Sequence, residues 1–399
     1  MQYPIADFAA VLAPFSLDRF FADHWERQPL VVRRSNSSYY HGLMTNRDLE
    51  DLISNPNTRY PAVKLAKGGQ FYPPESYTSD VEIGMCLFNG TLNLRAIAEE
   101  YSKGASITLP ALHRTCASIA AFCARLEQEL DHSIHANAYL TPGRASGFPP
   151  HYDAHEVLVL QLAGRKCWQI NEPTVKLPHS EHRFKPEGFT PGPRLMEVEL
   201  EAGDLLYLPR GYVHSTTTSE SHSAHVTIGI TVCTWADVVR GIIPSAVESE
   251  ELRKALPPGF ASRAEIRPAL VEKLQQILSG RFAANDIARL FERFIFQIKS
   301  ARQPPFVPFR ADVIVISPDL LLQTPSQQHY NLAPGVADHV VLNFDGKTFG
   351  FPGLIGPTLR AMCDRVRFRL QDLPAGLDSE LLLKLARHLH GIGFLRPAA

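Results

Sequence analysis

The spacing of hydrophobic residues changes twice along the chain. In the first part, hydrophobic residues recur at intervals of three and four over 17–25, which predicts one face of a helix. Pro29 ends this helix, and a short strand is expected at 30–32. Residues 118–130 predict a second amphipathic helix. The first part of the chain therefore mixes helices and strands.

Residues 137–234 have the pattern of a β-sheet protein, with short hydrophobic runs separated by Gly, Pro and Asp. The run at 157–162 is expected to turn at 163–165 and to return as a strand at 166–170. Further strands are expected at 195–200, 205–208, 212–214 and 224–232. Several short strands with regular turn signals indicate a sandwich or barrel of antiparallel sheets, and not a strand–helix–strand repeat.

Beyond residue 235 the pattern becomes largely helical. One hydrophobic stripe runs along 270–278 and a wider one along 287–298, after which Gln303-Pro304-Pro305 interrupts the pattern. The remaining segments predict strands at 312–316 and 340–342, and helices at 358–370 and 380–390.

The wider stripe is too hydrophobic to face solvent along its whole length. It either packs on its own domain or forms an interface between two copies of the chain. Twofold dimers are the commonest protein assembly. Because Phe291, Phe294 and Ile298 lie on one stripe, we favour a homodimer.

The composition is that of an ordinary globular protein. The 399 residues suggest two or three domains, and 45% hydrophobic with 20% charged residues leaves ample material for a core. Lys and Arg number 40 against 41 Asp and Glu, so the formal net charge is −1. That balance argues against a protein that coats DNA or RNA.

Four arginines gather near the end of the chain, but acidic residues interrupt them. From Asp338 onward, eight Lys and Arg stand against six Asp and Glu. We therefore expect no direct nucleic-acid binding there, and interpret the segment as a structural or partner-docking module. The arginines are Arg360, Arg365, Arg367 and Arg369.

Cysteine usage and the N-terminus predict a cytoplasmic protein. The six cysteines form no Cys-x-x-Cys pair, which fits a reduced intracellular setting better than a disulfide scaffold or a zinc ribbon. The first residues lack the basic and hydrophobic segments of a secretory signal. No hydrophobic run approaches 18 residues, so no membrane span is expected.

The chemically informative segment is His151-Tyr152-Asp153. On a strand, side chains at i and i+2 share one face, so this His and Asp could meet on a single ion. His214, expected at the end of a later strand, is the best third ligand. Two His and one carboxylate on an octahedral ion leave three positions open, which suits Fe(II) that binds a co-substrate and dioxygen. A His-x-Asp pair alone is usually a surface coincidence or a hydrogen-bonded pair.

Two neighbouring residues leave alternatives open. His155 would share the face of Asp153 on a regular strand, so it is either a rival ligand or a residue at the mouth of the pocket. Lys166 shares a face with Trp168. Its ammonium either extends to solvent or points into the barrel, where it needs a negative partner such as a dicarboxylate co-substrate.

Taken together, these motifs resemble the JmjC branch of the cupin superfamily, and within it the ribosomal oxygenases, which hydroxylate arginine or histidine of ribosomal proteins. The resemblance covers nearly the whole chain. It rests on 20–32, 137–142, His151-Tyr152-Asp153 with Glu156 and Gln161, Gly164-Arg165-Lys166 with Trp168, and 203–214.

The resemblance implies an α+β fold whose core is a double-stranded β-helix, the jelly roll of cupins. It implies a catalytic domain with N-terminal α/β elements over 1–235, a helical dimerisation region over 236–305 and a winged-helix-like domain over 306–399. A likeness in fold does not by itself fix the function.

The resemblance also implies the site. Fe(II) would be held by His151, Asp153 and His214, and the distal carboxylate of 2-oxoglutarate would bind Lys166. Asn137 and Tyr139 would line the pocket near co-substrate and substrate. Phe148 stands where some JmjC enzymes have a hydroxyl group that contacts 2-oxoglutarate, and His225 with Thr227 are either pocket members or structural residues.

The implied reaction consumes dioxygen and 2-oxoglutarate, releases succinate and carbon dioxide, and hydroxylates a side chain of a protein or peptide. A ribosomal protein is the first expected substrate. The alternatives are tailoring of a peptide natural product, N-methyl-lysine demethylation, and a non-catalytic cupin module that binds metal structurally or not at all.

Overall fold

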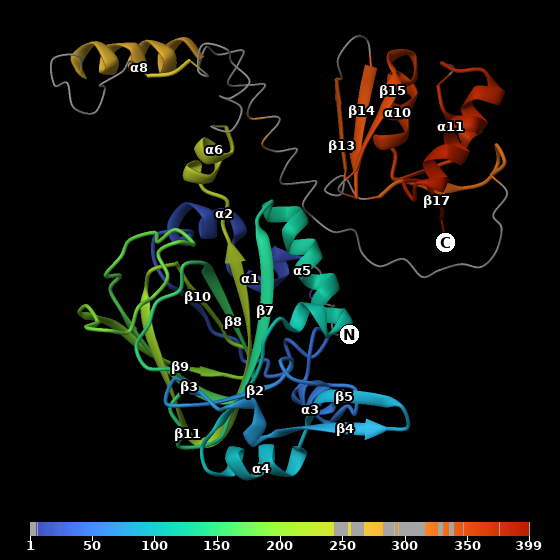
Figure 1. Cartoon of the computed structure of the whole chain (residues 1–399). Coiled ribbons are helices and arrows are strands. Elements are labelled where there is room, and N and C mark those ends of the chain that lie inside the picture. Colours follow the sequence, from blue (N-terminus) through green and yellow to red (C-terminus); the bar gives the residue numbers. More distant parts are fainter. Residues whose placement is uncertain are drawn as a thin grey trace. The chain divides into compact units, whose positions relative to one another are not determined.

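The computed structural model divides the chain into two compact units, Met1–Thr234 and Trp235–Ala399 (Figure 1). The first unit is described almost completely and the second in part. The residues that the structure describes are 5, 7–242, 254–256, 267–281, 291, 294, 316–325, 330–334, 339–345, 347–374 and 376–398.

Two long antiparallel strands, β8 (Glu156–Asn171) and β11 (Val213–Thr231), form the centre of the first unit. They belong to a nine-stranded sheet with the order β1-β10-β8-β11-β7-β6-β2-β3, and β9 pairs with the far end of β8. The other strands are β1 (Leu30–Val32), β2 (Lys64–Lys67), β3 (Gln70–Phe71), β6 (Ser106–Leu109), β7 (Ser133–Thr141), β9 (Arg194–Glu201) and β10 (Leu205–Leu208).

The sheet folds over on itself because β8 and β11 change partners halfway along. The first half of β8 pairs with β10 and the second half with β9, while β11 follows β8 through both halves. Side chains from the two halves of β8 and from β9 and β10 meet in one buried cluster inside the roll. This arrangement confirms the double-stranded β-helix, and the cluster comprises Val157, Val159, Trp168, Ile170, Val198, Leu200, Leu206 and Leu208.

The expected turn at 163–165 is wrong, because β8 continues through it as one strand. Gly164 has a φ of +62°, and a Cβ there would lie 1.8 Å from the carbonyl oxygen of His222. The glycine thus bends the strand against its neighbour where a loop was expected. In the same way, 212–214 and 224–232 are parts of the single strand β11, so His214 lies near the start of a long strand.

The outer face of the roll is covered by N-terminal helices. Leu158 and Leu160 alternate with the interior valines of β8 and pack in a second cluster with residues of these helices. A strand buried on both faces explains why 157–162 reads as a continuous hydrophobic run. The covering helices are α1 (Phe8–Leu12), α3 (Asn46–Ser54), α4 (Leu94–Ser102) and α5 (Ala117–Leu130).

The N-terminal predictions hold with small changes. The expected strand at 30–32 is β1, and the expected helix at 118–130 is α5. The helix expected over 17–25 consists of α2 (Leu17–Arg19) and a π-helical turn, Phe20–His24. A separate two-stranded hairpin, β4 (Thr78–Ile83) and β5 (Cys86–Leu92), was not foreseen.

The second unit contains helices α6 (Trp235–Ile242) and α8 (Arg267–Arg281), followed by a small α/β module. The module has a three-stranded sheet, a second sheet of three short strands, and two helices that share one hydrophobic core. Its elements are β12 (Leu322–Gln323), β13 (Tyr330–Pro334), β14 (His339–Phe344), β15 (Lys347–Pro352), α10 (Gly356–Cys363), β16 (Arg367–Phe368), α11 (Ser379–Gly391) and β17 (Arg396–Pro397).

The strand at 340–342 and the helix at 380–390 are confirmed as parts of β14 and α11. The helix expected over 358–370 ends earlier, at Cys363, because Phe368 is buried in a strand opposite Leu322. Most of the hydrophobic stripe at 287–298, the Gln303-Pro304-Pro305 break and the strand expected at 312–316 lie outside the described residues, apart from Phe291, Phe294 and Ile316.

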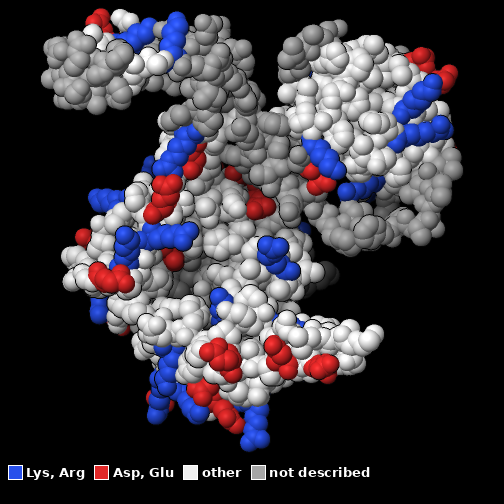
Figure 2. All heavy atoms as spheres, viewed as in Figure 1, with Lys and Arg blue, Asp and Glu red and all other residues white. Residues whose placement is uncertain are grey.

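None of the described helices has the length and hydrophobicity that a membrane crossing requires. On the face of the first unit seen in Figure 2, basic and acidic side chains are interspersed. This mixture agrees with the near-zero net charge of the sequence.

Candidate functional site

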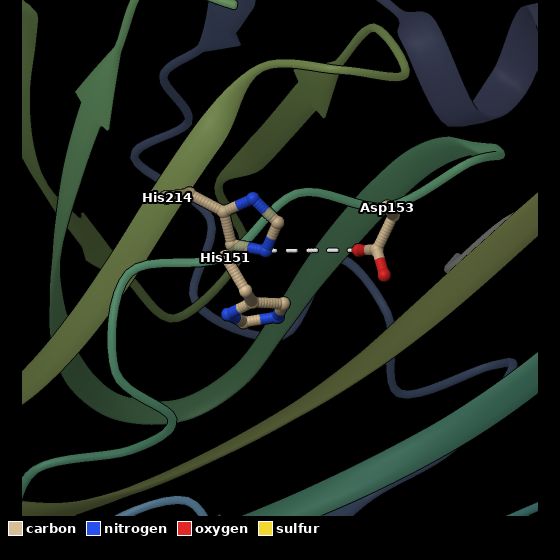
Figure 3. A group of neighbouring side chains, drawn as sticks. All are labelled: His151, Asp153 and His214. Carbon is tan, nitrogen blue, oxygen red and sulfur yellow. Dashed lines mark ion pairs between the residues drawn. The ribbon is translucent and has the colours of Figure 1, made fainter. Parts of the chain in front are cut away.

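Three side chains from two segments that are far apart in the sequence, His151 with Asp153 and His214, converge within the roll (Figure 3). One ligand-type atom from each of His151, Asp153 and His214 lies within 4.8 Å of the other two. Nε2 of His214 is 3.7 Å from Oδ2 of Asp153. Among the described residues, this trio is the only cluster of potential metal ligands that meets this spacing.

The segment that carries His151 and Asp153 is not the strand that the sequence predicts. Residues 149–153 form a loop, and within it only His151 makes a β-bridge, with His214. The two backbones exchange hydrogen bonds of 3.1 and 2.8 Å, while Gly211 N–H donates to the carbonyl of Asp153 at 2.9 Å. These bonds hold the loop against the start of β11 and so bring the three side chains together.

Backbone carbonyls orient both imidazoles of the trio. Nδ1 of His151 donates to the carbonyl of Pro149 at 2.8 Å, and Nδ1 of His214 donates to the carbonyl of Tyr212 at 3.2 Å. Each ring is therefore fixed by a group two residues earlier in the chain. With Nδ1 as the donor, the lone pair is on Nε2, which is the arrangement a metal-binding histidine requires.

The electrostatics of the trio also fit a divalent cation. Burial and the neighbouring His151 lower the pKa of His214 to about 4, so this imidazole is neutral at neutral pH. Burial raises the pKa of Asp153, but the surrounding imidazoles, led by His155, outweigh burial and leave it below its usual range. A neutral His214 imidazole and an ionised Asp153 carboxylate are protonation states that bind metal.

His155 lies beside the trio and is not a member of it. Its Nε2 is 3.8 Å from Oδ1 of Asp153, the carboxylate oxygen that does not face His214. Its Nδ1 lies 3.4 Å from the carbonyl of Glu156, and its ring packs edge-on against His135 at 4.7 Å. The sequence leaves open whether His155 is a rival metal ligand. In the structure it lies beside the carboxylate of Asp153, at the wall of the pocket.

The trio lines a cavity of about 280 Å³. Its walls are alternate residues of β7, β8 and β11, as the pleat of a sheet requires. The lining includes every site residue expected from the sequence, together with Phe148, His155, His225 and Thr227. The expected site residues are His151, Asp153, His214, Lys166, Asn137 and Tyr139.

Lys166 is buried in this cavity, so the interpretation that it extends to solvent is wrong. Only 3% of the residue is exposed, and its Nζ donates to Oγ1 of Thr141 at 3.1 Å. Burial alone lowers the pKa of Lys166 to about 7. The cavity therefore contains a desolvated amine whose charged form needs an anionic partner.

Asn137 and Tyr139 occupy the same face of β7 as Thr141. Oδ1 of Asn137 accepts from the backbone N–H of Ala111 at 2.9 Å. Tyr139 stacks on His225 with ring centres 5.0 Å apart, and burial raises the pKa of its phenol to about 12. Tyr139 is thus a protonated hydroxyl at neutral pH, able to donate a hydrogen bond into the cavity.

Sequence reasoning missed two polar residues beside Lys166. Thr141 accepts hydrogen bonds from Lys166 and from Ser106, the latter at 3.1 Å, so its own proton is free to be donated. The alternation of Asn137, Tyr139 and Thr141 could have identified Thr141. Nothing local indicates Ser106, because it reaches the cavity only through the pairing of β6 with β7.

A buried network of charged side chains, centred on Arg210 and Glu156, lies next to the segments that carry the trio. Arg210 is 6% exposed and pairs with the fully buried Glu156 at 2.9 Å and with Glu26. Tyr207 donates to Glu156 and accepts from the backbone N–H of Glu26 at 2.9 Å. Since Glu156 is three residues from Asp153 and Arg210 is four from His214, the network fixes the segments that carry both ligands. A buried charge pair is costly to break.

Comparison with known proteins agrees with this geometry. Residues 112–238 match the family described as JmjC domain. The chain is 32% identical to human ribosomal oxygenase 1 over 310 residues, which cover 70% of this chain and 45% of that protein. It is 28% identical to the Aedes aegypti bifunctional lysine-specific demethylase and histidyl-hydroxylase NO66, over 75% of this chain and 49% of that protein. The chain thus spans less than half the length of these relatives.

Solved structures show the same fold. Escherichia coli ribosomal oxygenase YcfD, in complex with cobalt and 2-oxoglutarate, superposes with a TM-score of 0.52 over 97% of this chain and 99% of that one, at 17% sequence identity. Its complex with cobalt and succinic acid gives a TM-score of 0.54 at 16% identity, with the same coverage.

Proposed function

This chain belongs to the JmjC ribosomal oxygenase-like family, and on that premise we propose that it is an Fe(II)- and 2-oxoglutarate-dependent oxygenase that hydroxylates a side chain of a protein or peptide. The observation that supports this most directly is a single cavity with a His-Asp-His trio and the buried amine of Lys166. A metal that must also bind a co-substrate needs open positions, and a trio of protein ligands leaves them.

His151, Asp153 and His214 would hold the metal, which supplies the oxidation chemistry when bound together with 2-oxoglutarate and dioxygen. Lys166 would bind the distal carboxylate of 2-oxoglutarate, and Thr141 would donate a second hydrogen bond to it. The cobalt and 2-oxoglutarate complex of Escherichia coli YcfD supports this pairing of metal and co-substrate.

The remaining side chains would orient the reactants and keep water away. Tyr139 keeps its proton and can donate into the cavity, while Asn137 is fixed by the backbone of Ala111. Trp168 and Val157 form a hydrophobic part of the cavity wall, between the His-Asp-His trio and the amine of Lys166. A dry, rigid cavity strengthens each hydrogen bond to the bound co-substrate and limits side reactions.

A ribosomal protein is the first candidate substrate, because the curated relatives are called ribosomal oxygenases. The name of the Aedes aegypti relative gives lysine demethylation as a second candidate. A peptide natural product and a non-catalytic metal-binding module remain the competing interpretations of the same fold.

One experiment tests the reaction and the substrate together. The full chain is incubated with Fe(II), 2-oxoglutarate and ribosomes from cells that lack it, and succinate release and intact protein masses are measured. Hydroxylation adds 16 Da to one ribosomal protein, whereas demethylation removes 14 Da. The His151→Ala variant is the control. Bound metal without succinate formation under any condition would favour the non-catalytic module.

We further propose that the chain forms a homodimer through its helical region, over about 236–305. The half-exposed Phe291, at 39%, supports a hydrophobic surface there. Light scattering of the full chain would give twice the mass of the 44.4 kDa protomer. A monomer at micromolar concentration would contradict the proposal.

The remaining proposals concern domains and location. We propose a catalytic domain over 1–235 and a winged-helix-like domain over 306–399, for which the three-stranded sheet with α10 and α11 is the support. We also propose a cytoplasmic location, supported by a sequence whose six cysteines form no Cys-x-x-Cys pair. Fractionation of cells that express the tagged chain tests the location.

A further inference from the structure

The four histidines of the cavity differ in how their Nδ1 atoms are used. In His151, His155 and His214, Nδ1 lies against a backbone carbonyl, at 2.8, 3.4 and 3.2 Å. In His225, Nδ1 is buried and has no hydrogen-bond partner among the described residues. His225 is thus the exception in a cavity whose other imidazoles are satisfied by the protein itself.

An unpaired ring nitrogen at this position is costly. His225 is only 2% exposed, so bulk water cannot replace the missing partner. Buried polar atoms in folded proteins are nearly always hydrogen-bonded, because losing the partner costs more than the bond itself contributes. Since His225 lines the cavity, its buried and unpaired Nδ1 points to a ligand that completes it.

The strand register places His225 near the amine end of the cavity. His225 is the direct cross-strand partner of Tyr139, and Thr141 follows two residues later on the same face of β7. Thr141 accepts the hydrogen bond from Lys166. Burial first, and the positive charge of Lys166 second, keep the pKa of His225 well below its usual value, so its ring is neutral. The contribution of Lys166 indicates that the two side chains are close enough to interact electrostatically.

The ring of His225 is also held in place on both sides. Tyr139 stacks on one face with an angle of 13° between the rings, and Trp168 meets the ring edge-on at 5.6 Å. Such packing removes the rotational freedom of the imidazole before any ligand binds. A hydrogen-bond donor that is fixed in advance discriminates between ligands more strongly than a mobile one.

We propose that His225 is a specificity-determining residue, whose Nδ1–H donates a hydrogen bond to the distal carboxylate of the 2-oxo dicarboxylate bound by Lys166. This inference rests on the proposed function and extends it. Lys166 supplies the charge, whereas His225 and Thr141 supply directed hydrogen bonds. Together they distinguish a carboxylate from a methyl group at the far end of the co-substrate.

Binding measurements with two compounds test the proposal. Calorimetry of the full chain loaded with Mn(II) gives Kd for 2-oxoglutarate and for 2-oxopentanoate, which has the same carbon chain without the distal carboxylate. The variants are His225→Phe, which keeps the ring shape, and His225→Asn, whose amide nitrogen can replace Nδ1. His222→Phe, an exposed histidine on the same strand, is the matched control.

The expected result is that His225→Phe weakens 2-oxoglutarate binding about 10- to 100-fold, as for loss of a bond to a charged group, and leaves 2-oxopentanoate unchanged. His225→Asn should recover part of the loss, and His222→Phe should have no effect. Equal weakening of both compounds would overturn the proposal, since His225 would then only shape the cavity.

A second result would overturn the proposal without touching the proposed function. If His225→Phe binds 2-oxoglutarate like the wild type while Lys166→Met does not, the carboxylate is held by Lys166 without His225. If the wild type loaded with Mn(II) fails to bind 2-oxoglutarate at all, the proposed function fails, and this inference fails with it.

Discussion

The two ends of the cavity are built on opposite principles. At the metal end, backbone carbonyls orient both imidazoles, and His214 already has the neutral form that metal binding needs. At the amine end, Lys166 is buried, and burial alone, with no contribution from an acidic side chain among the described residues, lowers its pKa to about 7. The first end is arranged by the protein in advance. The second remains unfavourable until a ligand supplies the missing charge.

This contrast teaches where each end obtains its selectivity. On the proposed function, the metal end would select by geometry, because one ligand atom from each of three side chains would have to reach the same ion. The amine end selects by charge, because only an anion repays the cost of burying an ammonium group. Variants at the two ends should therefore differ in which property they change.

The largest effect is expected from the metal ligands. Asp153→Ala removes the only carboxylate of the trio and should lower both metal affinity and turnover by about a thousandfold or more. Equilibrium dialysis with Mn(II) measures the affinity without relying on activity. His155→Ala is the matched control, since His155 contacts the same carboxylate from outside the trio. An equal loss in His155→Ala would make it a ligand.

The next effect is expected at the other end. Lys166→Met should leave Mn(II) affinity unchanged and weaken 2-oxoglutarate binding by about a hundredfold, because a charge-assisted bond is lost in a buried site. Calorimetry measures both quantities on one sample. An unchanged requirement for 2-oxoglutarate would remove Lys166 from its proposed role.

A pH series separates the two ends further. Binding of the carboxylate requires protonated Lys166, whose pKa in the free protein is about 7. Affinity for 2-oxoglutarate should therefore be constant below pH 7 and fall up to about tenfold per unit above it. Tyr139, with its pKa near 12, and His225, which stays neutral, do not change charge between pH 7 and 8.5. Lys166→Arg stays charged and should give a flat profile, and a flat profile for the wild type would contradict the assignment.

The burial of Lys166 should also affect the stability of the protein. The folded pKa of Lys166 lies below its unfolded value of 10.5, so the unfolded chain binds more protons between pH 7 and 10.5 and the wild type gains stability as pH rises. The Lys166→Met variant has no amine at this position, so the unfavourable free energy of burying one is absent. Its free energy of unfolding should exceed that of the wild type by roughly a few kcal/mol at pH 7, with the difference shrinking toward pH 10. Urea unfolding at both pH values measures it, and a constant difference would show that the burial of charge is not the cause.

The sequence predicted the core of the fold well, because hydrophobic alternation and turn residues record which faces are buried. The motifs also identified the three residues that converge, although 149–153 is a loop and not the expected strand. Alternation could not show this, since a bridge between His151 and His214 depends on a strand more than 60 residues away.

The errors share one physical cause. Glycine commonly occupies turns, so the sequence predicts a turn at Gly164, yet its φ of +62° bends a continuous strand where His222 comes close. Ser106 was missed because strand order, and not local pattern, brings it to Thr141. Local patterns record burial and conformation but carry no information on which distant strands become neighbours.

The ion network behind the site has a practical consequence for anyone who wishes to trim this protein. The region that matches the JmjC domain begins at residue 112, yet Glu26, Ser106 and the strand that borders β10 all precede it. A fragment cut at that alignment boundary would remove one of the two carboxylate partners of the buried Arg210 and expose the edge of β10 to aggregation. A fragment that keeps these contacts therefore starts at or before Glu26, well ahead of the region that matches the JmjC domain.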